Sequence, residues 1–239
     1  MNYQERTYRN RVSQNSLTSF HVLVRETDLL IHCDNDLSQK ALESVFIYRR
    51  FIESYIMKHP AFLTSLAPIQ DDVLAPPIVR HMLKASLAAN VGPMAAVAGA
   101  ISEYVARELL KMSQNVIVEN GGDIYLKCHD EVRVGVFAGN SPLTYNIGLL
   151  LKPEQMPIGV CTSSGTVGHS LSFGKADAVC VLSKSSTMAD AAATAIGNLV
   201  KEKGDIQTAL EEGIKIHGVL GCLIVIGQHL GVIGDIELI

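Results

Sequence analysis

The sequence lacks tryptophan and is poor in aromatic and charged residues. Aromatic residues make up 5% and charged residues 18% of its 239 residues, whereas hydrophobic residues make up 48%. Such a chain can bury a core, so disordered, collagen-like and coiled-coil classes are excluded. The net charge is -4, and no basic run is longer than Arg49-Arg50. Because phosphate backbones are bound by clustered basic residues, we expect no nucleic-acid partner.

Long apolar runs and paired cysteine motifs are missing too. No run approaches the roughly 18 apolar residues of a membrane span, and residues 1–11 are polar where a signal peptide would be apolar. The five cysteines are odd in number and contain no C-x-x-C motif, which argues against a disulfide framework and a structural zinc site. We therefore expect a cytoplasmic protein without a membrane partner, with cysteines in its core and residues 1–239 forming a single domain.

The apolar spacing predicts helices and strands in separate runs. Alternation at 20–24 and an apolar run at 29–33 predict a hairpin, and three- and four-residue spacing predicts a long helix from Asp36 or Ser38 to His59. The same criteria predict a loop at 61–77, helices at 78–89, 95–112, 187–202 and 206–217, and strands at 116–118, 124–126, 132–137, 145–151, 178–182, 220–226 and 232–239. This order predicts an α+β fold with a mainly antiparallel sheet packed against long helices.

Common catalytic signatures are absent. The segment from Gly168 to Gly174-Lys175 resembles a P-loop, but it has five intervening residues instead of four, and Ala176 stands where a magnesium-binding Ser or Thr is needed. G-x-G-x-x-G, G-x-S-x-G and H-E-x-x-H are also missing. The residues therefore favour neither a P-loop enzyme nor a standard hydrolase.

Three loops of glycine or other small residues remain as candidate binding elements. The first is Asn120-Gly121-Gly122-Asp123, between two predicted strands. Its glycines allow positive φ and a close approach of a ligand to the backbone, and Asp123 can hydrogen-bond a ribose, a base or a metal-bound water. By itself the tetrapeptide is equally an ordinary hairpin turn.

The second loop begins at Thr162 and is rich in hydroxyl groups. Ser163, Ser164 and Gly165 follow, and His169 comes four residues later. Its peptide N–H groups could surround an anion such as a pyrophosphate, although a solvated surface loop has the same composition. His169 has two interpretations, a proton donor or a structural histidine.

The third candidate lies on the predicted helix that begins near residue 187. Asp190 and Thr194 are four residues apart, so they share one helix face, and both offer the hard oxygens that Mg²⁺ prefers. The alternative is an aspartate favoured by the dipole of its own helix and a threonine bonded back to a carbonyl.

In this order the motifs resemble those of the FAD:protein FMN transferases, the ApbE-like family once linked to thiamine biosynthesis. The matching text is E-N-G-G-D-I at 119–124, T-S-S-G at 162–165 with His169, and A-D-A-A-A-T at 189–194. The resemblance covers about residues 80–200. Each motif alone is weak, but the combination of G-G-D with A-D-A-x-A-T is fairly specific.

Members of that family bind FAD and Mg²⁺, transfer FMN to a Thr or Ser of a protein acceptor, and release AMP. The resemblance implies that Asp190 and Thr194 hold magnesium, and that these two residues and His169 are catalytic. It also implies a nucleotide site formed by Asn90, Gly121, Gly122, Asp123, Thr162, Ser163, Ser164, Gly165 and His169.

The sequence also departs from the family's pattern. The usual D-L-S-A-x-A-K-G aligns with residues 90–96, which puts Asn90 in place of the acid and Ala96 in place of the flavin-contacting lysine, and leaves the Pro93 carbonyl as a third metal ligand. The H-x-x-D-P-x-T-G loop is shortened at 169–174, and Glu119 replaces an asparagine. These differences indicate a divergent subfamily.

Two functions from different classes therefore stay open. One is a magnesium-dependent flavin transferase with FAD and a protein acceptor as partners, and the other is a noncatalytic protein that binds FAD or a small nucleotide. A cationic side chain near the site, Lys175 or Lys184, would favour the enzyme. An unrelated small-molecule enzyme using Glu103, Glu119 or His169 is a third interpretation. The oligomeric state is not predicted.

Overall fold

An eight-stranded antiparallel sheet runs through the centre of the protein in a computed structural model that describes residues 17–166 and 173–239. Its strand order is β1-β2-β3-β4-β7-β8-β9-β10, and each neighbouring pair is antiparallel. The strands are β1 (Thr18–Val24), β2 (Thr27–Cys33), β3 (Val116–Asn120), β4 (Asp123–Lys127), β7 (Ile158–Ser163), β8 (Ala178–Ser183), β9 (Val219–Ile226) and β10 (His229–Gly234).

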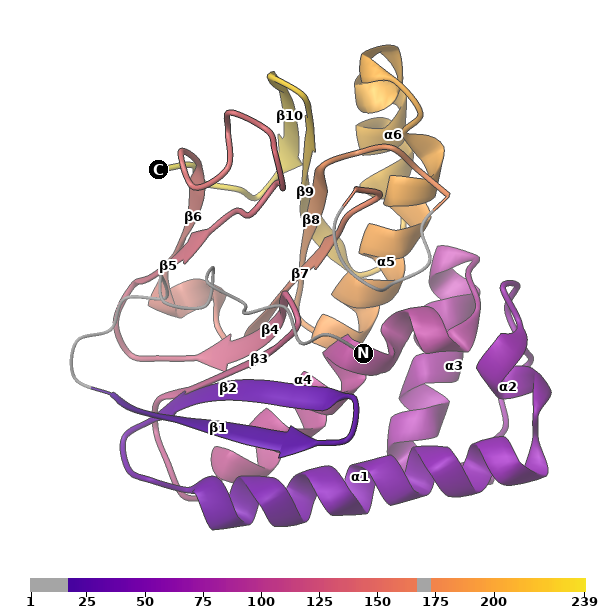
Figure 1. The fold of residues 1–239 in the computed structure, drawn as a ribbon, viewed down its shortest axis with the longest axis vertical. Helices are drawn as coiled ribbons and strands as arrows, with labels where there is room; N and C mark the ends of the chain where they lie inside the picture. Colours follow the sequence, from indigo (N-terminus) through magenta and orange to yellow (C-terminus); the bar gives the residue numbers. More distant parts are fainter. Residues whose placement is uncertain (1–16, 167–172) are drawn as a thin grey trace.

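The helices cover one face of this sheet, and a short second sheet lies on the other face (Figure 1). The helices are α1 (Ser38–Lys58), α2 (Ala61–Thr64), α3 (Pro77–Ala89), α4 (Val97–Leu109), α5 (Ser186–Leu199) and α6 (Ile206–Gly213), with 3-10 turns η2 (Pro93–Ala96), η3 (Pro153–Gln155) and η4 (Lys203–Asp205). The second sheet pairs β5 (Val132–Gly135) with β6 (Gly148–Leu151). The predicted α+β class with a mainly antiparallel sheet is confirmed.

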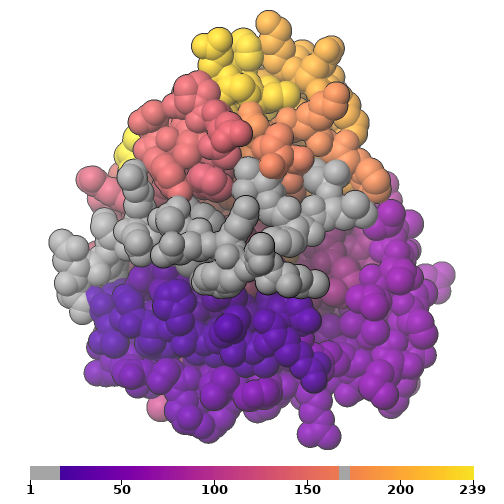
Figure 2. Space-filling view, viewed as in Figure 1, coloured from indigo at the N-terminus to yellow at the C-terminus, as the bar shows by residue number. Residues whose placement is uncertain are grey.

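Strand β3 shows how the sequence builds the two layers. Successive side chains of a strand point to opposite faces. Val116 and Val118 are buried against the helices, whereas Ile117 is buried against β5 and β6. In Figure 2 the pink region of the chain that contains β5 and β6 lies above the indigo region that contains β1. Because both faces of β3 are covered, its first three residues form a continuous apolar run rather than an alternating one.

Two glycines let α5 lie against the sheet and α4 at very short distances. A Cβ on Gly159 of β7 would lie 2.4 Å from the Ser186 Cα, and a Cβ on Gly99 of α4 would lie 2.2 Å from the Ser186 carbonyl oxygen. Neither space could hold a side chain. The first turn of α5 therefore packs closely between β7 and α4.

Several element boundaries differ from the predicted ones for local reasons. Strand β6 begins at Gly148 rather than at residue 145, because Tyr145 has a φ of 60° that an extended strand does not allow. Helix α2 interrupts the predicted loop, and its Phe62 is buried. Helix α5 ends at Leu199 because Val200 is extended and its carbonyl accepts from the Lys175 N–H.

The cysteines are all unpaired and buried, as predicted: Cys33, Cys128, Cys161, Cys180 and Cys222. Burial raises the pKa of Cys33, Cys128, Cys180 and Cys222 to about 12. These thiols are therefore protonated at neutral pH and act as small core groups.

No single helix in the described part of the chain is both long and apolar enough to cross a membrane; Pro77–Ala89 and Pro93–Leu109 meet that requirement only as a pair bent by 107°.

Hydrogen bonds to Asp34 connect the end of β2 to the loop before β3. Its carboxylate accepts hydrogen bonds from the Ser113 hydroxyl, the Gln114 N–H, and the backbone and side chain of Asn115, at 2.8 to 3.0 Å. These bonds, with the Asn115 side chain first, lower the pKa of Asp34 to about 2. We expect Asp34→Ala to reduce the free energy of unfolding by about 2 kcal/mol at pH 7.

The pH dependence provides the check on Asp34. Its folded-state pKa is below the unfolded value, so its stabilising effect is present at neutral pH and disappears as the pH falls from about 4 to about 2. Urea unfolding should therefore show a much larger difference between wild type and Asp34→Ala at pH 7 than at pH 2. The control is Asp130→Ala, at an exposed position. An equal loss at both pH values would contradict the assignment.

Candidate functional site

The turn between β3 and β4 presents the G-G-D motif at the edge of the helical layer. Gly121 and Gly122 have φ values of 68° and 105°, which match the predicted tight turn between paired residues Asn120 and Asp123. The Asn120 side chain donates to the Ala98 carbonyl at 3.1 Å, and the Gly122 N–H donates to Glu119 Oε1 at 2.9 Å. The turn is therefore fixed to the start of α4.

Asp123 and Asp190 come together from distant parts of the sequence. Asp123 pairs with Cys161 of β7, and the Cys161 thiol contacts the Ser186 carbonyl at the start of α5 at 3.2 Å. Asp190 lies one turn further along α5. The G-G-D and A-D-A-A-A-T motifs therefore meet at one site, as expected.

Asp190 lies at the N-terminus of α4, not at that of its own helix. The Gly99 N–H, in the first turn of α4, donates to Asp190 Oδ2 at 2.8 Å. The dipole that favours a carboxylate here therefore belongs to α4. The interpretation of Asp190 as a residue stabilised by its own helix is wrong, because α5 begins at Ser186 and its first turn is already capped by Ser185, whose side chain accepts from the Met188 N–H.

The two carboxyl groups perturb each other electrostatically. Burial raises the pKa of Asp190 to about 7, even though the N–H groups of Gly99 and Ala98 act in the opposite direction. Burial, followed by the charge of Asp190, raises the pKa of Asp123 well above its usual value. Two like charges in an enclosed site disfavour full ionisation unless a cation lies near both.

Thr194 adds a hydroxyl one turn beyond Asp190. It is half-buried and forms no hydrogen bond with any residue that the structure describes, so the alternative of a bond back to a carbonyl is not observed. The site thus offers carboxylate and hydroxyl oxygens, which suit Mg²⁺ or Mn²⁺. By the chemistry of these donors, and by the repulsion that a cation would relieve, the residues fit a divalent metal.

The T-S-S-G segment extends from the end of β7 beside this site. Thr162 and Ser163 are half-buried, and a Cβ on Gly197 of α5 would lie 3.7 Å from the Ser163 hydroxyl. The Ser164 hydroxyl accepts from the Thr166 N–H, and the Gly165 N–H donates to the Ala176 carbonyl. The Gly165 N–H is therefore already bonded within the protein and is not available to a ligand.

The remaining predicted residues have no hydrogen bond to Asp190 or lie outside the described chain. Asn90 is the exposed left-handed C-cap of α3, and Pro93 is buried at the start of η2. Neither has a hydrogen bond to Asp190 within residues 17–166 and 173–239. His169 lies outside the described residues. Lys184 lies at the far end of β8, where its ammonium donates to the Gln155 carbonyl at 2.6 Å. Lys175 is exposed next to Gly174.

A buried hydrogen-bond network around Glu103 holds the start of α5. This network was not predicted from the sequence. Glu103 Oε2 accepts from the Ser185 hydroxyl at 2.7 Å, the Thr187 N–H at 3.1 Å and the Thr187 hydroxyl at 2.9 Å, and Oε1 pairs with Arg107. Only the four-residue spacing of Glu103 and Arg107 could have indicated it from sequence. These bonds give Glu103 a structural role at the start of α5.

Solved structures show the same fold. The chain is similar to the flavin transferase ApbE of Vibrio cholerae, with a TM-score of 0.58, 12% identity, and coverage of 91% of this chain and 97% of that one. It is also similar to the flavinyl transferase ApbE of Pseudomonas stutzeri in its apo form, with a TM-score of 0.57, 12% identity, and coverage of 91% and 94%. At these identities the similarity establishes the fold.

Sequence comparison identifies nearer relatives. A UPF0280 protein of Methanococcus maripaludis strain C6 and one of Methanocaldococcus jannaschii are each 45% identical over 221 residues, which is 90% of this chain and 90% of each relative. The family model described as AbpE bacteria matches residues 9–231. The expected ApbE resemblance is thereby confirmed, and the chain belongs to the ApbE-like family, in a divergent branch with the UPF0280 proteins.

Proposed function

We propose that the protein is a magnesium-dependent flavin transferase, which moves FMN from FAD to a Thr or Ser of a protein acceptor. The observation that carries this proposal is the meeting of Asp123 and Asp190 at the N-terminus of α4. Two carboxylates that repel each other, one buried and one half-buried, are costly to keep without a counter-cation. The fold shared with flavin transferases supports the same function.

Asp190 and Thr194 are the proposed metal ligands, with Asp123 as the carboxylate that faces them. When bound there, Mg²⁺ would supply charge neutralisation on the pyrophosphate. In the transfer, the acceptor hydroxyl oxygen bonds to the FMN phosphorus and the bond from that phosphorus to the bridging oxygen breaks. AMP leaves with the bonding electrons, and the hydroxyl proton is released.

The protein's own groups orient the nucleotide. Gly121 and Gly122 leave the β3–β4 turn without side chains, so a ligand can reach its backbone. In this proposal the hydroxyl groups of Thr162 and Ser163, half-buried at the end of β7, donate to phosphate oxygens. His169 remains a proposed participant.

A second candidate function is a noncatalytic FAD or small-nucleotide binding protein. The observation that favours it is the lack of the expected cation, since Ala96 is buried where the family offers a lysine and Lys184 is turned away from the site. Loss of one charge-stabilising donor lowers a rate about 100- to 1000-fold. We therefore expect slow rather than rapid transfer.

Release of AMP tests the proposal. Protein incubated with FAD, Mg²⁺ and a Thr-containing protein acceptor should release AMP slowly, in step with covalent flavin on the acceptor, and EDTA should stop both. Chromatography measures AMP, and mass spectrometry detects the flavin. FAD binding without AMP after long incubation would favour the noncatalytic function. FAD binding is measured from changes in the visible absorption spectrum. No FAD binding would contradict both candidate functions.

A further inference from the structure

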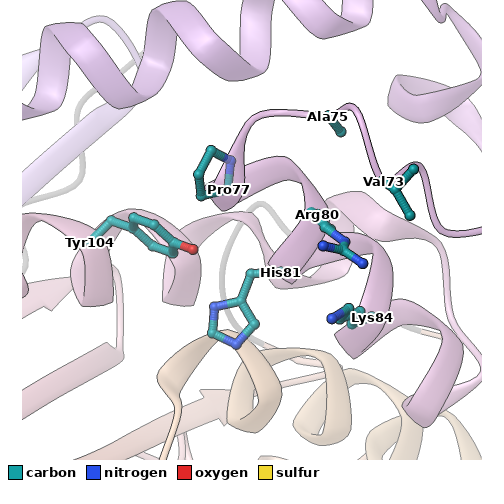
Figure 3. Close-up of a pocket in the computed structure, with 7 residues that line it drawn as sticks. All are labelled: Val73, Ala75, Pro77, Arg80, His81, Lys84 and Tyr104. Atoms are coloured by element: carbon teal, nitrogen blue, oxygen red, sulfur yellow. The ribbon is translucent and has the colours of Figure 1, made fainter.

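A pocket away from the Asp190 site opens between the loop before α3, helix α3 and helix α4 (Figure 3). Its volume is about 380 Å³, which lies within the range of small-molecule sites. Val73 and Ala75 of the loop, with Pro77 at the start of α3, supply its apolar lining. This open pocket has the size and the apolar wall to contact one side of a small organic molecule.

The helix α3 side of the pocket is positively charged. Arg80 and Lys84 are four residues apart and lie on one helix face. Lys84 forms no salt bridge with any described residue, and Arg80 contacts Asp71 through Nε and Nη2 at 3.3 Å, which leaves Nη1 for another acceptor. Among the residues that the structure describes, those that line the pocket include no carboxylate, and the nearest one to Arg80 is its partner Asp71. The lining therefore favours an anion.

Tyr104 provides a neutral donor fixed in position. Its ring packs edge-on against Tyr48 with centroids 5.1 Å apart, and the Arg107 guanidinium lies 5.5 Å from its centroid. Its hydroxyl points toward the space between Pro77 and His81, and it hydrogen-bonds no residue in the described part of the chain. Burial raises the pKa of Tyr104, so this hydroxyl remains a donor at neutral pH.

We propose that this pocket binds an organic anion, a carboxylate or a phosphate monoester with a small apolar body. Lys84, Arg80 and Tyr104 donate to the anionic group, and the loop residues contact the apolar body. The pocket's lining shares no residue with the candidate metal and nucleotide site, so the inference does not depend on the proposed flavin transfer.

His81 lies on the floor of the pocket and can report its occupancy. The groups facing it are Ser185, whose hydroxyl is 3.2 Å from Nε2, Glu103, whose Oε1 is 4.0 Å from Nδ1, and the cations Arg107 and Lys84. Burial lowers the pKa of His81, Glu103 raises it, and the two cations lower it further. An anion bound beside Lys84 offsets the cations, so the pKa of His81 should rise on binding.

The test titrates the full chain, without FAD or metal, with phenyl phosphate and separately with benzoate. Calorimetry should show saturable binding of at least one probe, and the NMR signals of the His81 ring should show the upward pKa shift. Lys84→Ala should weaken binding about ten- to hundredfold and Tyr104→Phe about two- to tenfold. Lys127→Ala, which removes an exposed lysine from β4, is the matched control and should bind like wild type.

Two results would overturn the assignment: no saturable binding of either probe, or equal affinity in Lys84→Ala and Lys127→Ala. Asp190→Asn should retain binding. If that variant lost the probes while Lys84→Ala kept them, the anion would lie in the nucleotide site and the pocket would be rejected. If the pocket binds the probes, the ratio of the wild-type affinities for phenyl phosphate and for benzoate distinguishes a phosphate ligand from a carboxylate ligand.

Discussion

Asp190→Asn is expected to abolish measurable Mg²⁺ binding in the presence of FAD and to lower AMP release at least about 100-fold. Asparagine keeps the size of the side chain and can still accept from the Gly99 N–H, so helix α4 stays capped. What is lost is the negative charge that a divalent cation requires. Calorimetry with Mg²⁺ in the presence of FAD, and chromatography of AMP, measure the two effects.

Two further variants test whether Asp190 is a metal ligand or only a structural residue. Thr194→Val removes the neighbouring hydroxyl without changing charge, and should weaken Mg²⁺ binding by a smaller factor than Asp190→Asn. Asp130→Asn removes an exposed carboxylate elsewhere and should leave both measurements unchanged. Equal Mg²⁺ affinity in wild type and Asp190→Asn would mean that Asp190 only caps α4.

Gly159→Ala is expected to have the largest effect on stability, a loss of about 3 kcal/mol. The new Cβ would lie 2.4 Å from both the nitrogen and the Cα of Ser186. These are backbone atoms, so relief requires α5 to move away from β7. Chemical denaturation at pH 7 should show a lower midpoint, and the displaced α5 should also weaken nucleotide binding.

Gly204→Ala is the matched control for this clash. A Cβ on Gly204 would meet only the far end of the Glu202 side chain, at 3.7 Å. We expect a change within about 0.5 kcal/mol, as for other surface substitutions. Equal denaturation midpoints for Gly159→Ala and Gly204→Ala would show that β7 and α5 are not held at this short distance.

Local patterns were sufficient for most helices and strands. The long helix predicted from Asp36 or Ser38 is α1, because its apolar positions recur at helical spacing over more than five turns. The predicted hairpin around Gly121 and Gly122 is the β3–β4 turn, since two glycines with positive φ are what a tight turn requires. Boundaries failed where a single residue, such as Tyr145, adopts an unusual φ.

The contacts within the candidate site could not be predicted from spacing. Gly99 and Asp190 are 91 residues apart, and nothing in either segment indicates that one caps the other's helix. The family resemblance predicted that Asp123 and Asp190 lie in one site. The contacts of Cys161 and Glu103 depend on three-dimensional packing and were not predicted. The assignments of Asn90, Pro93 and His169 to the site stay predictions.

Helices α4 and α5 cap each other. Asp190 of α5 accepts from the Gly99 N–H at the start of α4, and Glu103 of α4 accepts from the Thr187 N–H at the start of α5. Fraying of either helix therefore removes the acceptor that satisfies the other's first turn. The pair opens as one cooperative unit rather than as two separate helices, so the site between them is lost or kept as a whole.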